Sequence, residues 1–355
     1  DRRQRQMCIR DRDINMKGLQ NGDMAVKDVE RQNIAAFGRG DCKGNDGGRH
    51  LPYNDFGSWL HSRFPYKVQK ISVNAGFSCP NRDGRIGFGG CTFCDNNTFN
   101  PSYCDSRKSV AEQLEVGKRF FSRKYPDMRY LAYFQAYTNT YAPLDSLKRM
   151  YEEALSVENV VGLVIGTRPD CVDPQMLDYL GELSRQTFVI VEYGVESTND
   201  ETLKRINRGH TFECSRRAIE ETAGRGIITG GHVILGLPGE DRMENLHQAI
   251  DISATKLHIL KIHQLQIIKG TTLALEYERR PFKLYSPNEY VTLLTEYIQH
   301  LRPDIVLDRF TSQAPGSMLV APCWGLKNHE FANLLVNHMR ETGAWQGQMY
   351  KNSQS

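Results

Sequence analysis

The 355-residue chain contains no run of about 18 consecutive apolar residues, so the sequence predicts no membrane-spanning helix. Its first residues lack the apolar segment of a secretory signal peptide, and we expect a cytoplasmic location. A strong net charge is also missing, because 45 Lys and Arg against 42 Asp and Glu give only +3. With 39% hydrophobic and 25% charged residues, the composition excludes a disordered or fibrous chain. A globular protein remains, without a strong overall attraction to nucleic acid.

Residues 1–49 differ from the rest of the chain. They are rich in Arg, Asp, Asn and Gly and show no apolar period of two or 3.6 residues. They hold 11 basic and 8 acidic residues, whereas residues 50–355 hold 34 of each. We expect a disordered or non-native leader here, followed by a folded body with no net charge.

From residue 51 onward, short apolar segments alternate with amphipathic ones. Strands are predicted at residues 68–74, 130–135, 160–167, 188–197, 227–236 and 257–267. Helices are predicted near residues 107–124, 143–156, 174–185, 211–225 and 240–254. Such units form a parallel sheet that right-handed crossovers curl into an incomplete (β/α)6 TIM-like barrel, of fold class α/β. Functional residues are then expected just after the strands.

The alternating pattern weakens after residue 268. A helix near 287–301, a short strand near 304–308 and a helix near 328–341 are predicted there. We therefore expect a barrel core at residues 50–268 and a C-terminal α/β extension at residues 269–355 that completes the substrate face.

Three of the nine cysteines, Cys79, Cys91 and Cys94, lie in one glycine-rich loop after the first predicted strand. Clustered cysteines in a cytosolic protein indicate a metal site more often than disulfides. Three thiolates can hold three irons of a 4Fe–4S cluster and leave the fourth iron open to another ligand. With Cys104 as a fourth ligand, the same segment would form a zinc site in a nucleic-acid-binding protein. The spacing alone leaves both alternatives, and a set of merely packed thiols, open.

Further motifs follow this loop in a fixed order. The segments are CPNRDG (79–84), GGCTFC (89–94), YFQAYTNTYAP (133–143), GTRPDC (166–171), INRGH (206–210) and GLPGE (236–240). Together they resemble the radical S-adenosylmethionine (SAM) superfamily, and within it the YhcC/YtqA-like subgroup related to the elongator catalytic subunit. The resemblance covers roughly residues 53–345, although the interval between Cys79 and Cys91 is longer than the commonest spacing.

The resemblance implies a mechanism and its cofactors. Cys79, Cys91 and Cys94 would hold a 4Fe–4S cluster, which reductively cleaves SAM to a 5′-deoxyadenosyl radical that abstracts a hydrogen from the substrate. A flavodoxin- or ferredoxin-type partner would supply the electron. The protein itself would contribute positioning and exclusion of water.

The same resemblance assigns cofactor-binding residues. Phe93 and Ile234 would lie beside the SAM adenine. Glu196, Ser197 and His232 would lie near the ribose, and Arg208 would bind the carboxylate, which an arginine can hold bidentately. The residues that replace the family's glycine-rich turn at the SAM amino group are Gln135, Ala136, Tyr137 and Thr138.

Two residues are candidates for a catalytic role. Tyr137 stands where a glycine is usual, and Cys171 could donate a hydrogen atom. In the same segment, Arg168 and Asp170 are spaced to form an ion pair.

The substrate is the least determined feature of the sequence. The elongator-like resemblance points to tRNA, with a carboxymethylaminomethyl group on the wobble uridine trimmed to aminomethyl. A small metabolite or a protein is the alternative substrate. Substrate-contacting residues are expected at the last strand ends and in the extension, with the candidates His263, Gln264, Lys269, Arg309 and Trp324.

Overall fold

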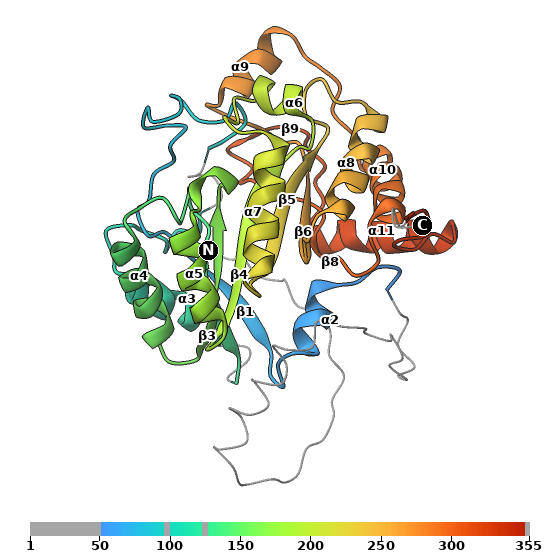
Figure 1. The fold of residues 1–355 in the computed structure, drawn as a ribbon. Helices are drawn as coiled ribbons and strands as arrows, with labels where there is room; N and C mark the ends of the chain where they lie inside the picture. The colour runs from blue at the N-terminus through green and yellow to red at the C-terminus, as the bar shows by residue number, and fades with distance from the viewer. Residues whose placement is uncertain (1–50, 96–99, 123–126, 352–355) are drawn as a thin grey trace. The chain divides into compact units, whose positions relative to one another are not determined.

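The computed structural model describes residues 51–95, 100–122 and 127–351, so the expected leader at residues 1–49 lies outside the described residues. Its centre is a parallel sheet of seven strands (Figure 1). The strands, in spatial order, are β1 (Val68–Val73), β2 (Arg129–Phe134), β3 (Val160–Thr167), β4 (Phe188–Glu196), β5 (Ile228–Leu235), β6 (Ile259–Gln264) and β8 (Val306–Arg309). This order confirms the predicted α/β partial barrel.

The longer helices cover the outside of the sheet (Figure 1), and all of them except α11, which follows the last strand, lie between successive strands in the chain. They are α3 (Val110–Ser122), α4 (Leu144–Ser156), α5 (Pro174–Ser184), α7 (Phe212–Gly224), α8 (Arg242–Ala254), α10 (Pro287–His300) and α11 (Asn328–Glu341). Polar caps define their starts: Asp173 and Thr211 accept backbone N–H groups at α5 and α7, and Ser286 forms a capping box with Glu289 at α10. None of the helices in the described ranges is long and apolar enough to cross a membrane.

Three short helices and a small second sheet were not predicted. The helices are α2 (Phe56–His61), α6 (Asp200–Arg205) and α9 (Thr272–Arg279). The predicted strand 257–267 is divided, because β6 ends at Gln264 and the chain then forms β7 (Ile267–Ile268), which pairs antiparallel with β9 (Leu319–Ala321). Figure 1 shows α6, α9 and β9 at the end of the sheet where the parallel strands terminate.

The strand predicted near 304–308 belongs to the barrel sheet and not to a separate extension. As β8, it pairs in parallel with β6 through Ile259↔Val306 and Leu260↔Leu307. The connection between β6 and β8 includes α10, which packs on α8 and so serves as one more crossover helix. The barrel therefore has seven strands, one more than the six predicted.

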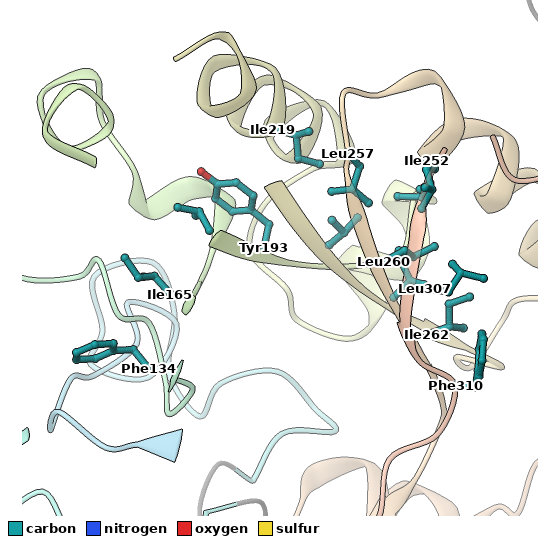
Figure 2. Close-up of a cluster of buried hydrophobic side chains, with 14 of the residues drawn as sticks. Phe134, Ile165, Tyr193, Ile219, Ile252, Leu257, Leu260, Ile262, Leu307 and Phe310 are labelled. Atoms are coloured by element: carbon teal, nitrogen blue, oxygen red, sulfur yellow. The ribbon is translucent and has the colours of Figure 1, made fainter. Parts of the chain in front are cut away.

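The two faces of the sheet differ in chemistry. The outer face packs on the helices through buried apolar side chains, among them Phe134, Ile165, Tyr193 and Leu260 (Figure 2). The inner face is apolar only near the amino ends of the strands, where α2 packs Phe56 and Leu60 against it. Side chains alternate between the two faces along a strand, so the sequence neighbours of these outward-facing residues point into the barrel. The barrel interior between α2 and the carboxyl ends of the strands is left open for a site.

Candidate active site

A cavity of about 580 Å³ opens at the carboxyl ends of the parallel strands. The loop after β1 contributes Cys79, Cys91 and Cys94 to its wall, and the ends of β2, β3, β4, β5, β6 and β8 contribute the rest. This is the edge of a parallel barrel at which functional residues were expected. The structure thus brings the three cysteines and the strand-end residues into one site.

Hydrogen bonds connect the cysteine loop to the segment after α6. Asn81 donates through its amide nitrogen to the backbone oxygen of Asn207, and the Asn207 amide donates to the Gly90 oxygen at 2.8 Å. The Thr92 backbone N–H also donates to the Ile206 oxygen at 2.9 Å. These hydrogen bonds bring the GGCTFC and INRGH motifs, which lie far apart in the sequence, into direct contact.

Arg208 lies against the cysteine loop with its side chain 8% exposed. Its Nη1 is 3.5 Å from the Cys91 Sγ, its Nη2 donates to the Gly194 oxygen at 2.5 Å, and its Nη2 lies 3.7 Å from a Glu196 carboxylate oxygen. Its Nε is buried without a partner among the described residues. A Cβ at Gly194 would approach the Arg208 Nη2 to 2.6 Å, so glycine leaves the room that the guanidinium occupies.

The three cysteines fit an iron–sulfur cluster better than a single ion. All three are free thiols, Cys79 and Cys91 are buried, and Cys94 is half-buried. In the described part of the chain, no three His, Cys, Asp or Glu side chains converge on a point where one metal ion could be held. A cluster does not require the three thiolates to meet at a single metal atom, because each thiolate binds a different iron.

Cys104, the fourth ligand of the zinc alternative, is engaged elsewhere. Its Sγ donates to the Ser72 oxygen of β1 at 3.1 Å, and burial raises the pKa of this thiol to about 12. The zinc alternative therefore lacks its fourth ligand.

In the metal-free protein, the local environment disfavours the thiolate form of Cys94. Burial, together with the neighbouring Cys91, raises the pKa of Cys94 to about 11, although Arg82 and Arg208 oppose the shift. Arg82 also donates to the Cys94 backbone oxygen at 2.7 Å. At neutral pH this thiol stays protonated until a metal takes the place of its proton.

Most of the other predicted cofactor-binding residues line the same cavity. They are Phe93, Gln135, Ala136, Tyr137, Thr138, Glu196, His232 and Ile234. Tyr137 and Glu196 have φ angles of +62° and +67°, a left-handed conformation that costs a residue with a Cβ about 1–2 kcal/mol. At Glu196 the register between β4 and β5 shifts, so this residue sits in a bulge. Strain of this kind concentrates at functional sites.

Two predicted site residues do not line the cavity. Ser197 is fully buried, and its hydroxyl donates to the Glu240 carboxylate, so it supports the turn after β5 instead of the cavity wall. The Cys171 Sγ lies 3.8 Å from an Asp170 carboxylate oxygen, and burial raises the pKa of this thiol to about 12. Its role as a hydrogen-atom donor stays a prediction.

The expected Arg168–Asp170 ion pair is present. The two side chains form a bidentate pair with two distances of 2.8 Å, and the Arg168 Nη2 also donates to the Arg208 backbone oxygen at 2.8 Å. Arg168 thus holds the segment that carries Arg208.

Three of the five candidate substrate residues line the cavity, and the other two lie outside it. His263, Gln264 and Arg309 line the cavity. Lys269 is exposed beyond the end of β7. Trp324 is part of the core, where it stacks on Phe331 and donates its indole N–H to the Tyr285 oxygen at 3.0 Å.

A charged network inside the barrel, of which Glu192 reaches the cavity wall, was missed from the sequence. Its members come from β1, β4, β6 and β8 and are Lys70, Glu192, Lys261 and Asp308. His232 joins it with its Nε2 3.1 Å from a Glu192 carboxylate oxygen. Burial lowers the pKa of His232, and Lys261 beside it lowers it further, so the imidazole is neutral at pH 7. The signal in the sequence was a charged residue inside each of these largely apolar strands.

Comparison with known proteins identifies the family of the chain. Residues 79–250 match the family described as the Radical SAM superfamily, and residues 257–341 match the Radical_SAM C-terminal domain. YtqA of Bacillus subtilis is 32% identical over 299 residues, which are 84% of this chain and 93% of that protein. YhcC of Escherichia coli K12 is 40% identical over 272 residues, which are 76% of this chain and 87% of that protein.

More distant matches extend the comparison. A protein named tRNA uridine(34) acetyltransferase, from Methanocaldococcus jannaschii, is 26% identical over 187 residues, which are 52% of this chain and 33% of that protein. The solved structure of Elp3 from the archaeon Methanocaldococcus infernus, with an N-terminal deletion, superposes with a TM-score of 0.60 at 18% identity. The superposition covers 79% of this chain and 64% of the archaeal chain, and it shows that the two share a fold.

Proposed function

The chain belongs to the radical SAM superfamily, and from that premise we propose that this enzyme acts on the wobble uridine of tRNA. The modification we propose is the trimming of a carboxymethylaminomethyl group to an aminomethyl group. The family uses a 4Fe–4S cluster and SAM, and both are taken as cofactors of this enzyme. A flavodoxin- or ferredoxin-type protein is proposed as the electron donor.

One observation carries the proposal. A single cavity is lined by three cysteine thiols and also by His263 of β6 and Arg309 of β8, each with a nitrogen that has no hydrogen-bond partner among the described residues. Cofactor and substrate would therefore meet in one cavity. The match to a protein whose name includes tRNA uridine(34) supports a uridine at this position of tRNA.

The residues that line the cavity would have separate roles. Cys79, Cys91 and Cys94 would hold the cluster. When bound, the cluster and SAM supply a 5′-deoxyadenosyl radical that abstracts a substrate hydrogen. Phe93 and Ile234 provide apolar surface in the cavity wall, which excludes water from the reacting atoms.

Arg208 and Glu196 would position SAM. The Arg208 Nε has no hydrogen-bond partner in the part of the chain that the structure describes, and Arg208 lines the cavity, so its guanidinium has donor capacity left for a carboxylate. Ionised Glu196 only accepts hydrogen bonds and suits the paired hydroxyls of a ribose. The strained backbone of Glu196 directs this side chain toward the cavity.

Replacing Arg208 with methionine should weaken SAM binding about 10–100-fold, because a hydrogen bond to a charged group contributes about 1.5–3 kcal/mol. Equilibrium dialysis of the cluster-loaded protein with SAM measures the change, with iron content determined in parallel. Arg216→Met is the matched control, since Arg216 pairs with Glu213 and Glu220 on the outer helix α7. Equal SAM affinity in both variants and the wild type would show that Arg208 does not hold the cofactor.

Nucleoside analysis of tRNA tests the proposed substrate. We expect a deletion strain to accumulate carboxymethylaminomethyluridine and to lose the aminomethyl form and its derivatives. The wild-type gene should restore them, and a gene encoding Cys91→Ala should not. An unchanged nucleoside profile would point to the alternative, a small metabolite or protein as substrate.

A further inference from the structure

The four charged side chains of the network inside the barrel neutralise one another, and of these four Glu192 lines the cavity. The Lys70 Nζ lies 3.2 Å from Glu192 and 2.7 Å from Asp308. The Lys261 Nζ lies 2.6 Å from Glu192 and 3.5 Å from Asp308. Lys261 also donates to the Tyr133 hydroxyl at 3.1 Å. Two cations therefore face two anions, and this group leaves no charge for a ligand.

Arg309 follows Asp308 in β8 and adds one cation to the same cavity. Within residues 51–95, 100–122 and 127–351, no carboxylate lies within ion-pair distance of Arg309, and its guanidinium makes no hydrogen bond. Its Nε is fully shielded from solvent. Arg309 itself is half-buried and lines the cavity, so the rest of its guanidinium can be reached from there. An anion that enters the cavity could pair with this cation.

Two more polar groups on this wall lack partners in the described chain. They are the His263 Nε2 on β6 and the Gln266 Oε1 just after it. Burial, with Arg309 beside it, lowers the pKa of His263 well below its usual value, so the ring is neutral and one of its nitrogens carries an N–H. The Gln266 oxygen is an acceptor only. The wall thus offers donors for an anion and an acceptor for an N–H group.

We propose that Arg309 binds the carboxylate of the substrate, with the His263 Nε2 as a second donor and the Gln266 Oε1 accepting from the substrate amine. The inference rests on the proposed function, because a carboxymethylaminomethyl group carries a carboxylate one methylene away from an amine. A planar guanidinium matches a carboxylate bidentately, which a lysine at this position would not do. This subsite would also distinguish the acid from its neutral amide.

The experiment compares two anticodon stem–loop RNAs with the cluster-loaded enzyme, SAM and dithionite. One carries carboxymethylaminomethyl at the wobble uridine, and the other carries the corresponding carboxamide. Wild type should prefer the acid in kcat/KM. In Arg309→Gln we expect kcat/KM for the acid to fall about 10–100-fold and that for the amide to change little, because glutamine can pair with an amide. The ratio of acid to amide is the readout that a merely structural role would not move.

Arg280→Gln is the matched control, because it removes one exposed cation at the end of α9. It should keep the wild-type acid-to-amide ratio. If wild type converts the acid and Arg309→Gln keeps the wild-type ratio, the carboxylate subsite is wrong while the proposed function stands. If wild type converts neither RNA, the proposed function is wrong, and the proposed binding site for this carboxylate is wrong as well.

Discussion

Replacing Cys91 with alanine should cost the protein at least about 100-fold in iron affinity, whereas replacing Cys104 should leave iron binding unchanged. Loss of a group that merely orients a metal ligand already costs about 10–100-fold, so loss of a ligand costs more. Cys91 is buried, contacts Arg208 and accepts from the Asn81 amide at 3.8 Å, so its sulfur is held in place for a metal. Cys104 instead donates to a β1 carbonyl.

Iron and sulfide content after anaerobic reconstitution measures this difference. The two variants are matched, since each removes one thiol from the same region of the chain. Loss of bound metal in Cys104→Ala, with zinc as the metal of the wild type, would instead favour the zinc site.

Replacing Glu192 with alanine should lower the melting temperature by roughly 6–15 °C. Glu192 is 1% exposed and accepts from Lys70, Lys261 and His232. Removing one member of a buried charged group leaves the other charges without a partner, which lowers the free energy of unfolding by about 3–5 kcal/mol. For a chain of this size, each kcal/mol corresponds to roughly 2–3 °C in melting temperature. Glu213→Ala on the exposed side of α7 is the control and should melt close to the wild type.

The pH dependence of the same network has a definite sign. Burial alone would raise the pKa of Glu192, but Lys261 and Lys70 hold it well below its ordinary value of 4.5. A carboxyl group whose pKa is depressed in the folded state stabilises the protein above pH 4.5 and loses this contribution as the pH falls further. The melting difference between wild type and Glu192→Gln should therefore narrow below about pH 4.5. A difference that stays constant down to pH 3 would contradict the ion pairing.

The sequence predicted the fold class, the strand ends and the cysteine loop because each depends on a local pattern. Apolar segments such as residues 160–167 are strands by length and composition, and the loop motifs lie next to them. The strand β8 was assigned to an extension because its crossover is long and carries α9, α10 and the β7 segment. Chain order alone did not indicate that it rejoins the sheet.

Other features depend on tertiary structure that no local pattern encodes. Ser197 follows Glu196 in sequence, but the bulge at Glu196 turns Ser197 away from the cavity. Trp324 was a candidate for substrate contact, yet its ring packs on Tyr290 and Phe331. Lys70 and Lys261 stand 191 positions apart in the numbering of the chain and meet only because β1 and β6 both face the barrel interior. Long-range pairing of this kind requires the fold.

The most direct test of the central claim is an assay for 5′-deoxyadenosine. Protein reconstituted anaerobically with iron and sulfide would receive dithionite, SAM and the acid-bearing stem–loop RNA. A radical SAM enzyme with its cluster on Cys79, Cys91 and Cys94 yields 5′-deoxyadenosine, and the Cys91→Ala variant yields none above background. Equal amounts of product from the two proteins, or product from neither, would contradict the assignment of these cysteines to SAM cleavage.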